Sequence, residues 1–233
     1  MLVRMEQPMT HPANDSHRVW DLPTRLFHWL LVALIALQYA SGEFGWPSMQ
    51  WHYLCGYATL ALIAFRLLWG LCGSQTSRFG EFVRGPRAVW RYVAGLARGD
   101  ATHGAGHNPL GGWSVVLMLA SIALQATSGL FASDDISEEG PLVARVSAAT
   151  VAWMTRIHLW NRYVLLALIV LHLVAIASYG VLRGNNLVLP MLSGHARGVR
   201  AQSLRFAPGW LALLLFALAA AAVWALVAWG EAA

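Results

Sequence analysis

The sequence predicts an all-α integral membrane protein, with a four-helix transmembrane bundle and a fifth, C-terminal transmembrane helix. Of its 233 residues, 58% are hydrophobic and only 12% are charged, about half the charged fraction of a soluble domain. Five apolar segments are separated by polar loops. All sixteen basic residues are Arg, and they form no single run. Their positive charge therefore indicates membrane topology rather than nucleic-acid binding.

A spanning helix needs about 20 mostly apolar residues, and the five segments come close to this length. The first is the shortest but can be extended at both ends, and the second is interrupted by Arg66. The fifth has no His, Arg or acidic residue inside it. In order, the predicted spans are Leu26–Ala40, Tyr53–Cys72, Leu110–Ala132, His158–Leu182 and Trp210–Trp229.

The segments around these spans predict the domain organisation. Residues 1–18 read as a polar tail without the features of a cleavable signal peptide, so the first span is expected to stay as an anchor. Residues 19–194 hold the four-helix bundle, residues 195–208 form a basic linker, and residues 209–233 hold the added helix. Gly85–Gly99 interleaves apolar residues with Arg, which favours a helix on the membrane surface; a plain loop is the alternative.

The loop charges predict the orientation of the chain. Arg residues precede the first span, fill the loop between the second and third spans, and follow the fourth. The two other loops are acidic or neutral. Because Arg-rich loops stay in the cytoplasm, we expect a cytoplasmic N-terminus and a C-terminus on the outer side.

Four histidines lie in the predicted spans, where ionisable side chains are costly and tend to be functional. His158 and His172 are separated by about 40° less than four helical turns, and by about 21 Å along the helix axis. They therefore share one face at two depths, too far apart for one metal ion with imidazole nitrogens about 2 Å away. His28 and His52 begin successive antiparallel spans, at opposite membrane faces. The pattern predicts two pairs, His52 with His158 outside and His28 with His172 inside.

Two facing axial histidines are the arrangement that holds a b-type haem between the helices of a bundle. The sequence therefore predicts two non-covalent haem b groups, because the C-x-x-C-H motif for covalent attachment is absent. Cys55 and Cys72 fall about 25 Å apart on one predicted helix, too far apart to form a disulfide. A proton relay or a transition-metal site is the alternative use of the four histidines.

Small and cationic residues near the histidines fit the haem interpretation. Gly42 and Gly56 leave room between helices. Arg25, Arg66 and Arg162 are candidates to bind the haem propionates, and snorkelling to the membrane interface is the alternative for each.

Several motifs, in order along the chain, resemble the bacterial cytochrome b561 family. They are WDLPTRLFHWLL (Trp20–Leu31), WHYLCGYATLALIAFRLLWGLCGS (Trp51–Ser74), SRFGEFVRGPRAVWRYV (Ser77–Val93), GHNPLGG (Gly106–Gly112) and NLVLPMLSG (Asn186–Gly194). The resemblance covers Val19 to Gly194 and is closest to cytochrome b subunits associated with nickel–iron hydrogenases and small c-type cytochromes.

The resemblance implies a four-helix bundle holding two b haems, with His28, His52, His158 and His172 as the ligands. The chain departs from many relatives at Leu159, where they have an acidic residue, so no proton or quinone role is expected at this position. The implied function is electron transfer across a bacterial inner membrane. It would run between the quinone pool and a periplasmic partner, either a c-type cytochrome or a hydrogenase-like enzyme.

Two loops are candidates for the substrates of this transfer. The acidic outer loop Ser133–Pro141, with Asp134, Asp135, Glu138 and Glu139, is expected to dock a basic c-type cytochrome; ordinary loop acidity is the alternative. His107 and Asn108 are candidates to bind a quinone or a haem propionate. Their alternative role is to cap the third span, which has Pro109 in its first turn.

The sequence is also compatible with two rival functions. Some members of the resembling family oxidise superoxide at the periplasmic face and reduce quinone, for which Arg156 and Arg162 would provide a basic patch. The other rival is a non-haem membrane transporter or assembly protein.

Overall fold

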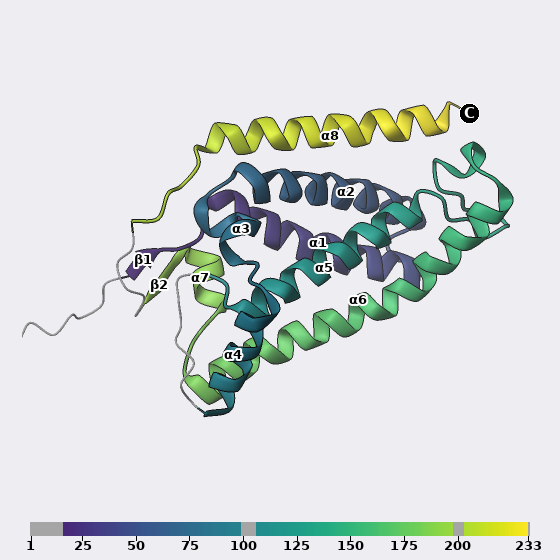
Figure 1. Cartoon of the computed structure of the whole chain (residues 1–233). Coiled ribbons are helices and arrows are strands. Elements are labelled where there is room, and N and C mark those ends of the chain that lie inside the picture. The colour runs from purple at the N-terminus through teal and green to yellow at the C-terminus, as the bar shows by residue number, and fades with distance from the viewer. Residues whose placement is uncertain (1–15, 99–105, 198–202, 233) are drawn as a thin grey trace, which may run out of the picture.

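The computed structural model describes residues 16–98, 106–197 and 203–232 (Figure 1). Most of the predicted N-terminal tail lies outside the described residues. Within them, five helices are long and apolar enough to cross a membrane. This confirms the predicted all-α membrane class.

The five long helices extend beyond the predicted spans at most ends. Short helices and one short strand lie between them, and a second short strand precedes the first long helix. The long helices are α1 (Leu22–Phe44), α2 (Met49–Cys72), α5 (Pro109–Gly129), α6 (Ala148–Arg183) and α8 (Gly209–Glu231). The short elements are β1 (Ser16–Arg18), η1 (Gln75–Ser77), α3 (Phe79–Phe82), α4 (Pro86–Arg98), η2 (Val143–Arg145), α7 (Val188–Ser193) and β2 (His195–Arg197). The segment Gly85–Gly99, for which a helix was favoured over a plain loop, contains the helix α4.

Helix α6 begins ten residues before the predicted start at His158. Its 36 residues span about 54 Å, far more than the hydrocarbon core of about 30 Å. The first turns include the polar residues Thr150, Thr155 and Arg156, so a prediction from hydropathy alone misses them. The helix is capped by Ser147, whose side chain accepts from the Thr150 N–H. His158 therefore lies inside the helix and does not open it, and His28 likewise lies in the second turn of α1 rather than the first.

The long helices pack as two pairs with α8 added on one side. Helix α1 packs on α2, α5 packs on α6, and α2 joins the pairs by touching α5. Helix α8 lies along α2 (Figure 1). Direct contact between α1 and α6 is sparse. Direct contact between α2 and α6 is also sparse, so neither histidine pair lies between closely packed helices.

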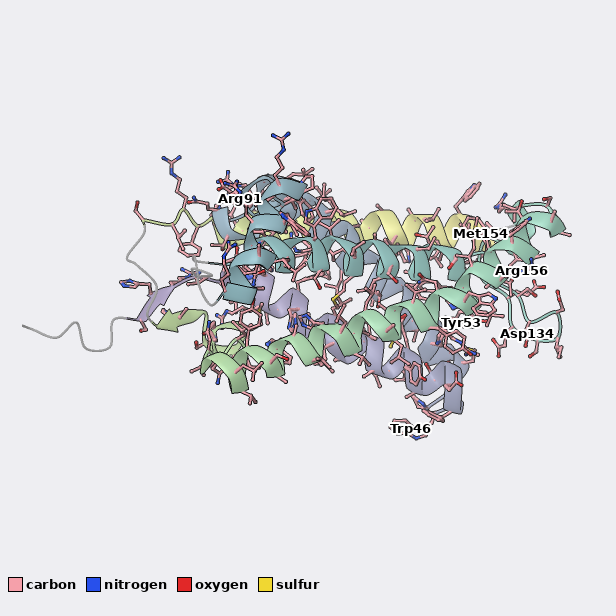
Figure 2. The ribbon with its side chains drawn as sticks, turned by 60° about the horizontal axis from the view of Figure 1, so that its bottom comes forward. Trp46, Tyr53, Arg91, Asp134, Met154 and Arg156 are labelled. Atoms are coloured by element: carbon pink, nitrogen blue, oxygen red, sulfur yellow. The ribbon has the colours of Figure 1, made fainter. Side chains whose placement is uncertain are left out.

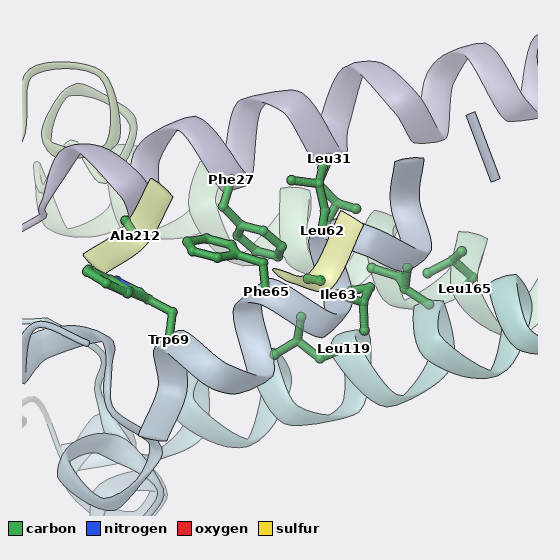
Figure 3. Packing of buried hydrophobic residues seen from close by; sticks show 11 residues of the cluster. Phe27, Leu31, Leu62, Ile63, Phe65, Trp69, Leu119, Leu165 and Ala212 are labelled. Carbon is green, nitrogen blue, oxygen red and sulfur yellow. The ribbon is translucent and has the colours of Figure 1, made fainter. Parts of the chain in front are cut away.

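One apolar core joins all five long helices (Figure 3). Phe27 comes from α1, Phe65 and the fully buried Trp69 come from α2, Leu119 comes from α5, and Ala212 comes from α8. Leu165 of α6 also belongs to the cluster. The added helix therefore packs into the same core as the bundle.

The sequence did not predict the small antiparallel sheet of β1 and β2. In its register His17 lies opposite Ala196, and the N–H groups of Val19 and Trp20 donate to the Gly194 carbonyl. The sheet joins the segment before α1 to the segment after α7. It fixes the two ends of the bundle region to each other.

Charged loops gather at the two ends of the helices. Figure 1 shows β1, β2, α3, α4 and α7 together at one end. Figure 2 shows Arg91 at that end and Tyr53, Asp134 and Arg156 at the opposite end. The Arg-rich loops and the acidic loop therefore lie on opposite sides of the apolar layer, as their charges predict.

Candidate functional site

The outer histidines, His52 of α2 and His158 of α6, face each other across the bundle. Their ring centroids are 6.1 Å apart and the ring planes are inclined by 78°. An imidazole nitrogen lies about 2 Å from a bound metal ion and about 1 Å from its ring centre, so two axial rings are about 6 Å apart. The observed separation fits a flat metal-bearing group held between the two rings.

Both outer rings are oriented by a backbone carbonyl. The Nδ1 of His52 lies 3.0 Å from the Gln38 carbonyl oxygen, and the Nδ1 of His158 lies 2.9 Å from that of Gln125. A carbonyl only accepts, so each Nδ1 carries the proton and donates. Each Nε2 then keeps its lone pair free, which is how metal-binding histidines are commonly held.

The two outer histidines have matching surroundings, which the sequence analysis missed. The residues beside His52 are QYASG (38–42) in α1, and those beside His158 are QATSG (125–129) in α5. The Ser hydroxyl of each motif, from Ser41 or Ser128, lies 3.4 Å from the adjacent Nδ1. A search for short local repeats preceding each outer histidine would have found this pattern.

The glycine that ends each motif lies directly against an imidazole. A Cβ at Gly42 would lie 3.0 Å from Cε1 of His52, and a Cβ at Gly129 would lie 2.9 Å from Cε1 of His158. Real Cβ atoms rarely approach that closely. Gly56, also predicted to make room, has only an ordinary contact at 3.7 Å. Gly42 and Gly129 are therefore the glycines that let the outer rings sit against the neighbouring helix.

The inner histidines are His28 of α1 and His172 of α6. They are close enough to interact electrostatically. The Nδ1 of His28 is buried without a hydrogen-bond partner. The inner ring of His28 thus lacks the carbonyl partner that orients each outer ring, among the residues that the structure describes.

Two of the three predicted propionate cations already have partners. Arg162 is ion-paired with Glu43 at 2.7 Å, which bridges α6 to α1 and reduces the net charge of the predicted outer basic patch. Arg25 donates to the Leu192 carbonyl and holds α7. Arg66 is buried, and no acceptor for it is present among the described residues.

Asn108 has the capping role considered for it. Its Oδ1 accepts from the Gly111 N–H at 2.7 Å, at the start of α5. Its Nδ2 donates to the Tyr179 hydroxyl at 3.2 Å, which also pairs with the Tyr92 hydroxyl of α4 at 2.7 Å. Asn108 thus links three helices at the Arg-rich end.

His107 lies beside this network in an aromatic setting. Its ring centroid is 4.8 Å from that of Trp20 and 4.6 Å from that of Phe82, and its Nδ1 is buried without a partner. Withdrawal from water lowers the pKa of His107 to about 3, and the charges of Arg66 and His172 act in the same direction. The imidazole is therefore neutral at physiological pH.

The acidic outer loop divides into structural and free carboxylates. Asp134 Oδ1 accepts from three backbone N–H groups, each at 2.9 Å, and these bonds lower the pKa of Asp134. Glu138 accepts from the Tyr53 hydroxyl at 2.8 Å. Asp135 and Glu139 instead line a pocket of about 590 Å³ between the loop and the first turns of α6.

Comparison with known proteins confirms the family resemblance that the sequence motifs indicate. A family model described as prokaryotic cytochrome b561 matches residues 19–194. The match includes α1, α2, α5 and α6 with all four candidate histidines, and it stops before α8. No curated protein and no solved structure matches the chain.

Proposed function

Because the chain belongs to the prokaryotic cytochrome b561 family and is therefore a haem b membrane cytochrome of electron transfer, we propose that it holds two haems at two membrane depths. The outer haem is held by His52 and His158, and the inner haem by His28 and His172. The observation that carries this proposal is the outer pair, with rings 6.1 Å apart and both Nδ1 atoms bonded to carbonyls.

Haem b supplies one-electron redox chemistry when bound. The protein's residues orient the ligands and exclude water. The carbonyls of Gln38 and Gln125 fix the outer imidazoles, and Gly42 and Gly129 allow them to lie close to the neighbouring helices. With two imidazoles per haem, no open coordination position remains. Simple electron transfer then suits the site better than oxygen binding at iron.

The proposed orientation of the chain in the bacterial inner membrane follows from the loop charges. The Arg-rich end is cytoplasmic and the acidic end is periplasmic. Electrons pass between a periplasmic redox partner, a c-type cytochrome or a hydrogenase-like enzyme, and the quinone pool. The Glu43–Arg162 pair gives the superoxide alternative less support, because it neutralises part of the basic patch that this reaction needs.

The first test is the haem content of the purified full-length chain, measured by pyridine haemochromogen. We expect two non-covalent b haems per chain. His158→Ala removes an outer ligand and His28→Ala removes an inner one, so each variant should retain a single haem, and the two remaining spectra should differ.

His195→Ala is the matched control, because His195 is exposed in β2 and should leave both haems in place. A wild-type chain with one haem or none would contradict the two-haem proposal. So would the loss of the same haem in both ligand variants.

A further inference from the structure

The guanidinium of Arg66 is buried, and none of the described residues accepts a hydrogen bond from it. Arg66 is only 2% exposed, and its Nη1 has no partner. Its Cζ lies 5.0 Å from the ring centre of Phe79 and 6.0 Å from those of Phe27 and Phe82. Aromatic rings stabilise a cation but accept few of the five N–H bonds that a guanidinium offers.

The acid that interacts with Arg66 is already engaged. Asp21 acts on Arg66 electrostatically, but its oxygens accept from Thr24 N at 2.7 Å, Trp69 Nε1 at 3.1 Å and Ser77 Oγ at 3.2 Å. These bonds cap α1 and tie it to the end of α2. Asp21 therefore balances some of the charge of Arg66 without satisfying its donors.

The position of Arg66 along α2 places it at the membrane depth of the inner histidines. Arg66 follows His52 by the same interval that separates His172 from His158. That interval is about 40° short of four turns, so Arg66 shares the face of α2 that carries His52 and lies at the depth of His172. The hairpins α1–α2 and α5–α6 thus differ at this position: α2 has the cation Arg66 where α6 has the proposed ligand His172.

His107 supplies a second unpaired group at the same place. It lies close enough to both Arg66 and His172 to interact electrostatically, and its buried Nδ1 has no partner. In the tautomer with a proton on Nδ1, this atom is a donor. Two groups from different segments, at the depth of the inner pair, thus lack an acceptor among the described residues.

We propose that Arg66 and His107 form a carboxylate-binding site, and that its ligand is a propionate of the haem held by His28 and His172. The inference rests on the proposed function, since it requires an inner haem. A planar guanidinium matches a carboxylate by two parallel hydrogen bonds. A neutral quinone carbonyl would add no negative charge and would leave Arg66 with only the partial compensation that Asp21 provides.

The test is a spectroelectrochemical redox titration of the purified holoprotein with Arg66→Gln and Arg66→Lys. Loss of a positive charge beside a haem favours its oxidised form. Arg66→Gln should therefore lower the midpoint potential of one haem, the one that His28→Ala removes, or abolish binding of that haem. Arg66→Lys keeps the charge and should retain most of the wild-type potential.

His107→Gln should shift the same haem in the same direction by less, and it serves as the test if Arg66→Gln does not accumulate. Arg87→Gln is the matched control, because Arg87 is an exposed cation at the same end and should change neither potential.

Unchanged potentials together with a raised KM for a water-soluble quinone analogue would overturn the proposal and assign Arg66 to the quinone. Unchanged potentials with unchanged quinone kinetics would also overturn it. A wild-type chain that lacks a second haem would instead contradict the proposed function, before any Arg66 variant is measured.

Discussion

In the proposed outer haem site, a short helical motif holds each of the two outer histidines. In Gln-x-x-Ser-Gly, the Gln, Ser and Gly fall on one helix face because they are three and four residues apart. The Gln carbonyl accepts from Nδ1, the Ser hydroxyl lies beside it, and the Gly lets the ring approach. Two copies of the motif, one in each hairpin, present two imidazoles to each other.

The glycine of this motif gives a sharp test at the scale of one residue. We expect Gly129→Val to abolish binding of the outer haem. Its Cβ would lie 2.9 Å from Cε1 of His158, and the imidazole would have to leave the Gln125 carbonyl. Haem content should fall by one per chain, with the outer-haem spectrum absent.

Gly180→Ala is the control on α6, since a Cβ there meets nothing within 4 Å. It should keep both haems and stabilise the helix by about 0.5–1 kcal/mol. Retention of both haems in Gly129→Val would contradict the role assigned to the close approach.

The candidate histidines could be predicted from sequence because helical periodicity fixes the face and depth of a residue within one helix. The partners of the cations could not. Arg162 pairs with Glu43, which lies in a different helix, and no local pattern connects the two. His107 and Arg66 likewise lie far apart in the sequence, and only the tertiary fold brings them close enough to interact electrostatically.

At the scale of elements, the first turns of α6 and helix α8 shape the outer end of the protein. Arg145 of η2 donates to the Trp229 carbonyl and its Cζ lies 4.4 Å from the ring centre of Trp229. A Cβ at Gly230 would lie 2.4 Å from the Pro141 carbonyl oxygen. The end of α8 is thus packed against the acidic loop, and hydropathy predicted the helix but not this contact.

The acidic loop is the element that we propose meets the periplasmic partner. We expect Asp135→Asn with Glu139→Gln to slow electron exchange with a soluble basic c-type cytochrome roughly tenfold at low salt. Both carboxylates line the pocket beside α6. The difference should vanish as salt screens the charges; stopped-flow haem oxidation measures the rates.

Asp134 and Glu138 are left intact in this test, because their bonds to the loop backbone and to Tyr53 hold the loop in shape. Glu81→Gln, at the Arg-rich end beside Arg78, is the control for loss of a negative charge elsewhere. An unchanged rate in the double variant would remove the docking role.

At the scale of the whole molecule, the long helices separate two unlike ends. Arg-rich segments surround α3, α4 and the small sheet, and carboxylates gather in the loop before α6 (Figures 1 and 2). Composition predicted this asymmetry because topology is set by Arg counts in short loops. The length of α6 and the β1–β2 pairing escaped prediction, because capping and long-range backbone bonds leave little trace in hydropathy.

The orientation can be tested with a matched pair of alkaline phosphatase fusions, one after Arg205 and one at the C-terminus. The enzyme needs disulfides and is active only outside the reducing cytoplasm. With the Arg-rich end inside, the fusion after Arg205 should be inactive. The C-terminal fusion should be active, because α8 is long and apolar enough to carry it across. Green fluorescent protein at the same sites should give the opposite pattern. A reversed pattern would place the acidic loop in the cytoplasm and exclude a periplasmic partner, whereas two inactive fusions would mean that α8 packs on α2 without crossing the membrane.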